Sequence, residues 1–185
     1  LCGIVKSWGE SDPQAAADYL LGLPPGPERT AMLQALAAVW ALVNPRQAAE
    51  VLLAKLEAAE KLAVAGEIAA CWAGQDPLQA LGWLQGLKED DDFRETTAQL
   101  IYSHWAESDP AAAATHVLQS GSAAAREEMN VVLARWVESD VAKALGWYHE
   151  NLTGDDQWRL AAPLALTIAR QDEKAAEAFL LDFKD

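Results

Sequence analysis

A tryptophan returns at nearly constant intervals along the 185-residue chain, and this recurrence limits the possible folds more than any other feature. Successive intervals are 32, 32, 33 and 31 residues, and the next residue in phase is Ile168. A fixed period of roughly 20–50 residues is typical of folds that stack one structural unit many times. We number the repeat from this position, so that position 0 holds Trp8, Trp40, Trp72, Trp105 and Trp136.

Further positions recur with the same phase. Position +4 is Asp or Asn in all six copies, Pro follows it in the first four, and position +8 is always Ala. Asp or Asn before Pro indicates a helix start, because the side chain accepts a first-turn N–H and Pro has no N–H to leave unpaired. We therefore expect a helix to begin next to each of Asp12, Asn44, Asp76, Asp109, Asp140 and Asp172.

Each repeat predicts two antiparallel helices. The first follows position +4 and is apolar at +8, +11 and +12, which share one face. The second is apolar at −7, −4 and 0 and runs into the tryptophan. Abundant Ala, Leu and Glu with few β-branched residues also favour helix over strand. The sequence thus predicts an all-α superhelix (solenoid) of about 5.5 helix-pair repeats of ~32 residues, with about 12 antiparallel helices.

The predicted solenoid forms a single domain over residues 1–185. It divides approximately into a partial repeat at 1–9, repeats at 10–42, 43–74, 75–107, 108–138 and 139–170, and a partial repeat at 171–185. Because the chain starts at Leu1 inside a second helix and ends after a first helix, we expect it to be a segment of a longer chain.

This pattern resembles the broad group of tetratricopeptide-like and HEAT-like helical repeats along the whole chain. Residues 80–83 and 144–147 both read Ala-Leu-Gly-Trp, which is similar to the Leu-Gly element of the first tetratricopeptide helix. The repeat departs from that family because it is shorter than 34 residues and carries its tryptophan at the end of the second helix. The resemblance indicates no specific family. It implies a protein- or peptide-binding scaffold and transfers no functional residue.

The net charge of the chain limits the classes of partner that it can bind. The net charge is −14 and the pI is near 4.5, so the surface repels nucleic acid and anionic lipid and attracts basic proteins or peptides. Acidity that only keeps an alanine-rich protein soluble is the alternative. No apolar run approaches the roughly 18 residues of a membrane span. We expect no nucleic-acid partner and no membrane span; the compartment stays open, with the cytoplasm favoured.

No residue pattern predicts catalysis, a metal or a cofactor. His104, His116 and His149 lack partners at metal-ligand spacing, and His116 at position +11 is expected to replace a packed aromatic residue. Nucleophile motifs, phosphate-binding loops and dinucleotide fingerprints are absent. The acidic run 89–92 is typical of a solvated helix-capping loop. We therefore expect no enzyme activity, no catalytic residue and no bound cofactor.

Two tryptophans outside position 0, Trp83 and Trp147, each follow a glycine inside a predicted helix. Such a glycine costs about 1 kcal/mol relative to alanine. Either Gly82 and Gly146 allow a neighbouring helix to pack closely, or they leave a recess in which an aromatic face is open to a ligand.

A cation stands near the start of every second helix, where the helix dipole disfavours it. We expect each cation to reach an acidic side chain or a helix C-terminal carbonyl of the neighbouring repeat, with Asp12, Asp76, Asp109 and Asp140 as candidates. The cations are Arg29, Lys61, Arg94, Arg126 and Arg159.

Positions +7 and +10 of the first helix vary between copies on a constant frame, as a binding face would. The sequence predicts a concave groove lined by the first helices, acidic near the N-terminus, that takes a basic or extended peptide in a salt-sensitive way. The candidate binding residues are Asp18, Glu50, Gln79, Trp83, Thr115 and Trp147. The alternatives are a regulatory or substrate-recruiting segment of a larger enzyme and a structural subunit that self-associates end to end.

Overall fold

The computed structural model describes residues 2–183, which form twelve α-helices and contain no strand. The six first helices of the repeats, here the short helices, are α2 (Pro13–Leu21), α4 (Pro45–Leu53), α6 (Pro77–Gln85), α8 (Pro110–Ser120), α10 (Val141–Asn151) and α12 (Glu173–Leu181). The six second helices, here the long helices, are α1 (Cys2–Ser11), α3 (Pro27–Val43), α5 (Ala58–Ala73), α7 (Asp91–Ser108), α9 (Ala125–Ser139) and α11 (Gly154–Ala169). The predicted all-α repeat of about 12 helices is confirmed.

One residue, at position +4, both ends a long helix and starts the next short helix. Its N–H donates to the carbonyl of position 0, as from Asn44 to Trp40 at 2.9 Å, in all six copies. Its side chain accepts from a first-turn N–H of the short helix, again in all six copies, as at Asn44 Oδ1 with Gln47 N. Each such cap contributes about 1 kcal/mol. The spacing of four residues between the tryptophan and the Asp or Asn is thus one helical hydrogen bond, and the predicted helix starts are confirmed.

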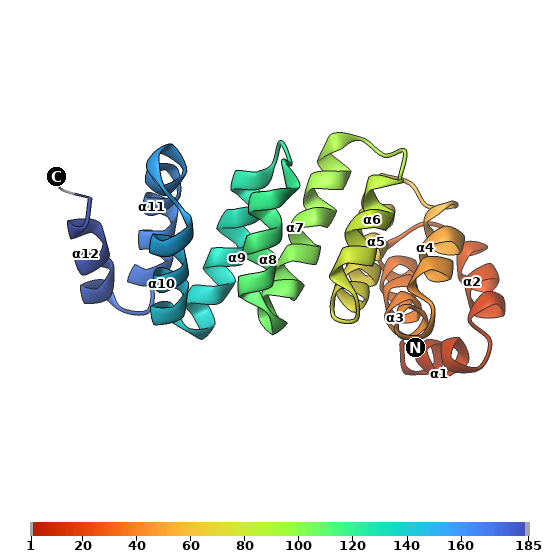
Figure 1. The fold of residues 1–185 in the computed structure, drawn as a ribbon. Helices are drawn as coiled ribbons and strands as arrows, with labels where there is room; N and C mark the ends of the chain where they lie inside the picture. The colour runs from red at the N-terminus through yellow and green to blue at the C-terminus, as the bar shows by residue number, and fades with distance from the viewer. Residues whose placement is uncertain (1, 184–185) are drawn as a thin grey trace. The chain divides into compact units, whose positions relative to one another are not determined.

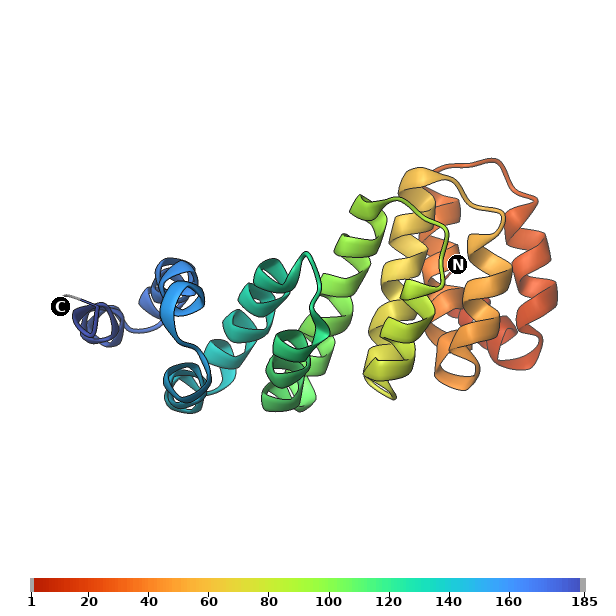
Figure 2. The ribbon, with the colours of Figure 1, turned by 45° about the horizontal axis from the view of Figure 1, so that its top comes forward.

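The chain divides into two compact units, residues 1–101 and 102–185, with the boundary inside α7. Each unit has two layers of helices. Figure 1 shows α4 and α6 in front of α3 and α5 in unit 1, and α8 and α10 in front of α9 and α11 in unit 2. Figure 2 shows the helices of unit 1 packed side by side in chain order. This order follows from the short connections, which force successive helices to run antiparallel.

The core of each unit is built from the recurring apolar positions. Ala at +8 is at most 5% exposed in every copy, which lets a neighbouring helix approach closely. Trp40, Trp72, Trp105 and Trp136 are buried as expected, but Trp8 is half-exposed. The burial expected of Trp8 is therefore wrong, because among the described helices α1 packs mainly against α2 and α3.

The two layers are not equally tight. Successive long helices contact each other extensively, as α3 does with α5 and α9 with α11, whereas successive short helices barely touch. The short helices therefore form the more widely spaced layer of each unit. The concave groove expected along the short helices stays a prediction; the face of these helices that points away from the long helices, here the outer face, is exposed.

Candidate functional site

The aromatic residues at position +11 pack on the tryptophan that stands eleven residues earlier, at position 0. The ring centroids lie 5.5 Å apart in Trp72–Trp83 and 5.9 Å apart in Trp136–Trp147. His116 takes the same place, 5.3 Å from the ring of Trp105, and its Nδ1 lies 2.9 Å from the Tyr102 hydroxyl. Burial lowers the pKa of His116, so the neutral ring is favoured. The structure thus gives His116 the packing role that its repeat position predicts.

Trp83 and Trp147 differ in what they offer to a ligand. Trp83 is only 9% exposed, while Trp147 is partly exposed beside its partner Trp136. Of the two predicted anchors, Trp147 therefore presents ring surface to solvent, and Trp83 lies within the core of unit 1.

The two glycines that precede these tryptophans have no packing role. Gly82 and Gly146 are exposed, and a Cβ atom built at either one meets no atom within 4 Å. Neither has a positive φ, so the backbone does not require glycine there. The close-packing explanation is wrong for both. The other explanation therefore remains. Each glycine leaves its helix without a side chain at an exposed position on the outer face of α6 or α10, next to an aromatic ring.

The remaining candidate residues also lie on the outer face of the short helices, and all are exposed. Asp18 Oδ1 lies 3.5 Å from Lys55 Nζ, and both side chains are more than half exposed. Gln79 Nε2 donates to Asp76 Oδ2 at 2.7 Å, and Thr115 Oγ1 donates to the Ala111 carbonyl at 2.7 Å. In unit 1, Asp18 and Glu50 are exposed on this face, and their role in binding stays a prediction.

The first-turn cation of α3 joins two repeats. Arg29 is buried, and its guanidinium binds the Glu60 carboxylate through two hydrogen bonds, one of them from Nε to Oε1 at 3.0 Å. Arg29 Nη1 also donates to the Leu23 carbonyl at 2.7 Å, and Thr30 Oγ1 donates to Glu60 Oε1 at 2.9 Å. The hydrogen bond from Arg29 lowers the pKa of Glu60, so this carboxylate stays charged well into acid.

The other first-turn cations fall into two classes. Lys61 Nζ reaches Glu89 Oε1 of the following repeat at 2.9 Å. Arg94 and Arg159 pair with Asp91 and Asp155 of their own helices. The expected contact with a neighbouring repeat therefore holds for Arg29 and Lys61, but their partners are Glu60 and Glu89. The expected acceptors Asp12, Asp76, Asp109 and Asp140 are wrong, because those side chains cap the short helices.

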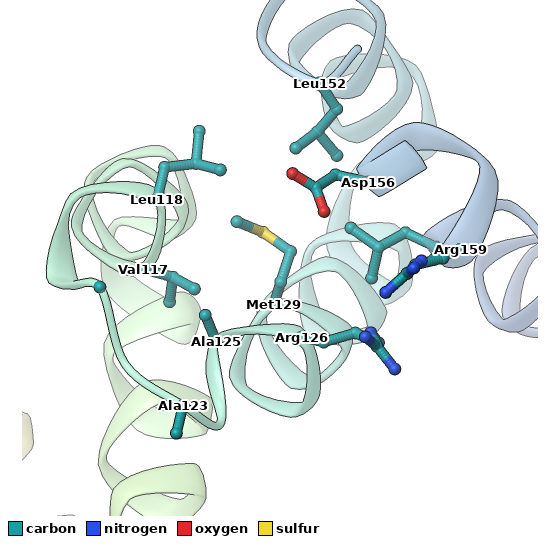
Figure 3. A pocket seen from close by; sticks show the side chains of 11 residues that line it. Val117, Leu118, Ala123, Ala125, Arg126, Met129, Leu152, Asp156 and Arg159 are labelled. Carbon is teal, nitrogen blue, oxygen red and sulfur yellow. The ribbon is translucent and has the colours of Figure 1, made fainter. Parts of the chain in front are cut away.

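A pocket in unit 2, which the sequence did not predict, lies between the C-terminal end of α8 and the first turns of α9 and α11 (Figure 3). Its volume is about 270 Å³, and both apolar side chains and the first-turn residues Arg126 and Arg159 line it. A second cavity of about 270 Å³ lies between α9 and α11, and a third is formed by the Pro-rich turn before α3. No His or Cys lines any of these three cavities.

The residues that the structure describes hold no group of three or more His, Cys, Asp or Glu side chains that could bind a metal ion. His104 Nδ1 lies 3.4 Å from Glu107, and His149 Nε2 lies 3.7 Å from Asp182. Across residues 2–183, no helix is both long enough and apolar enough to cross a membrane.

The chain was compared with protein families, curated proteins and solved structures. No protein-family model matches the chain. No curated protein matches it, and no solved structure does.

Proposed function

We propose that this protein is a non-catalytic scaffold that binds a partner protein or peptide on the outer face of its short helices. The observation that carries the proposal is the pair of open glycines, Gly82 and Gly146. Each costs about 1 kcal/mol of helix stability, and neither packing nor backbone conformation accounts for that cost. A site where a partner's backbone approaches the helix closely accounts for it, because a side chain would stand in the way.

The surroundings of the glycines support the same proposal. The helix frame repeats while the exposed position +10 changes from Asp18 and Glu50 to Gly82, Thr115 and Gly146. Trp147 offers a partly exposed ring next to its glycine, and aromatic rings are common anchors in protein interfaces. The acidic residues of unit 1 favour a partner with basic groups. Added salt should weaken binding of such a partner, because it screens the attraction between opposite charges.

The arrangement of possible catalytic groups favours binding over chemistry. His116 is part of an aromatic cluster, and His104 and His149 lie at the surface beside a single carboxylate each. Within residues 2–183, no histidine forms a hydrogen bond with a Ser, Thr or Cys side chain, so the nucleophile–base pair of a hydrolase or transferase site is not formed there.

The proposal is tested by filling the open spots. A Gly82→Gln/Gly146→Gln variant keeps two good helix positions and adds side chains where we expect the partner backbone. The immobilised chain and this variant are compared for the proteins that each retains from a lysate of the source organism. We expect the variant to lose at least nine tenths of the specifically retained protein.

The matched control is Ala31→Gln/Ala162→Gln, which adds the same side chains at exposed positions of the long helices α3 and α11. It should retain the same proteins as the unaltered chain. Equal retention by the glycine variant would place the binding face elsewhere. Once a partner is identified, Asp18→Ala and Glu50→Ala should each flatten the salt dependence of its affinity.

A further inference from the structure

The pocket of unit 2 has an apolar floor. Val117, Met129, Leu152 and Leu160 line it and are at most 4% exposed, while Leu118 is 45% exposed at its edge. These side chains come from α8, α9, α11 and the segment between α10 and α11, which Figure 3 shows converging on one space. The volume of about 270 Å³ is just below the roughly 300–1,000 Å³ of small-molecule sites. It suits one large side chain of a partner better than a metabolite.

Charged side chains line one side of this apolar pocket. Arg126 and Arg159 line the pocket from the first turns of α9 and α11, and Asp156 points into it (Figure 3). Arg126 is exposed, and none of the ion pairs formed by the described residues involves it. Within residues 2–183, Arg159 forms an ion pair with Asp155 alone, at 3.5 Å, and both side chains are more than half exposed. Such an exposed pair is weak, so two guanidinium groups are available to an incoming anion.

We propose that this pocket binds a short acidic segment of a partner protein, with one large apolar side chain seated on Met129 and Leu160. Carboxylates next to that side chain pair with Arg126 and Arg159, whose planar guanidinium groups bind carboxylates through two hydrogen bonds. Asp156 accepts a backbone N–H of the bound segment. On a chain of net charge −14, two cations without a strong partner beside an apolar cavity form a specific exception to the acidic surface.

This pocket is separate from the face of the short helices around Gly146, because no residue of α10 itself lines it. It therefore adds a second site of opposite charge preference, and neither site depends on the other. A scaffold with both would hold a basic and an acidic segment at once.

The test uses fluorescently labelled peptides with blocked ends and measures their anisotropy against the full chain. The probe is a seven-residue peptide with one central Leu flanked on each side by Glu. We expect saturable binding that weakens at least tenfold when Leu is replaced by Ala, and at least tenfold when each Glu is replaced by Lys. Equal or tighter binding of the Lys-flanked peptide would overturn the proposal, as would no saturable binding of the Glu-flanked one.

Variants assign the binding to the pocket. Arg126→Gln/Arg159→Gln should weaken the probe peptide at least tenfold, and Leu118→Ser should weaken it severalfold while keeping the buried floor. The control Arg46→Gln/Arg170→Gln removes the same charge at exposed positions outside the pocket and should leave affinity unchanged. Gly82→Gln/Gly146→Gln should also leave it unchanged, which separates this site from the short-helix face. Equal losses in the Arg126/Arg159 variant and its control would mean attraction by net charge alone.

Discussion

Unit 1 and unit 2 use the same repeat position for different purposes. In unit 1, Arg29 and Lys61 at the start of a long helix each bind a carboxylate of the next repeat, whereas Arg94 binds Asp91 of its own helix. In unit 2, Arg126 and Arg159 remain available and line a pocket. The sequence explains part of the difference. Arg29 binds Glu60, the residue just before the first-turn cation of the next repeat, whereas the corresponding residue in the repeat after Arg126 is Trp158, which has no charge. The first-turn cations of α3 and α5 thus link neighbouring repeats in unit 1, whereas in unit 2 the same position is available to a ligand.

The frame itself should be equally strong in both units, and the largest effects test this. Trp72→Ala in unit 1 and Trp136→Ala in unit 2 each remove a buried ring that packs, tilted, against a second tryptophan. We expect each to lower the free energy of unfolding by roughly 3–5 kcal/mol in urea titrations. A loss under about 1 kcal/mol in one unit only would show that the two frames differ.

The ion pairs should separate the units. Glu60→Gln leaves the buried guanidinium of Arg29 without its carboxylate, so we expect a clear fall in the urea midpoint. Asp155→Asn, which breaks the exposed pair of Arg159, should leave the midpoint unchanged. The double variant Arg29→Met/Glu60→Met removes both charges and should recover most of the loss. Equal midpoints for Glu60→Gln and Asp155→Asn would remove the distinction.

Acid should weaken unit 1 through the same ion pair. Because Arg29 lowers the pKa of Glu60, the folded state binds this proton less readily than the unfolded state, whose ordinary value is 4.5. The contribution of the pair is therefore complete above that value and is lost as the pH falls through the lower folded pKa. Stability measured from pH 7 down to pH 3 should fall less steeply in Glu60→Gln. Parallel curves for the two proteins would contradict the role given to this carboxylate.

The open glycines should behave alike in the two units, with the smallest effect. Gly82→Ala and Gly146→Ala each place a methyl group in open space on a regular helix, so each should raise the free energy of unfolding by about 1 kcal/mol. A destabilisation of either variant in thermal or urea unfolding would show that the glycine supports the fold, and would remove the main argument for a binding role.

The helix starts and the repeat frame were predictable because local rules determine them. Asp or Asn at +4 caps a helix whatever surrounds it, and Ala at +8 is buried wherever two helices cross. The partners of the cations were not predictable, because Glu60 and Glu89 stand 12 and 16 residues before their tryptophans, Trp72 and Trp105. Because these distances differ, Glu60 and Glu89 do not occupy the same position of the repeat, and a comparison of the repeats does not identify them as equivalent partners.

The pocket and the unequal spacing of the two layers were missed for a similar reason. The connection between α8 and α9 borders the pocket and contains Gly121, whose φ is 61°. Which layer is tighter depends on the side chains that separate the helices, and a repeat pattern does not give their spacing. The glycines were visible as an anomaly in the sequence, but only the empty space around them excludes close packing.

The short reach of the contacts between repeats has a consequence for synthesis on the ribosome. The side-chain hydrogen bonds that join described repeats within the units span at most 34 residues, as between Gln75 and Ala41. A repeat that has left the exit tunnel therefore finds its partners once about one more repeat has emerged, without waiting for a distant segment. Translation can thus build the stack from the N-terminal end, with apolar surface exposed mainly on the newest repeat.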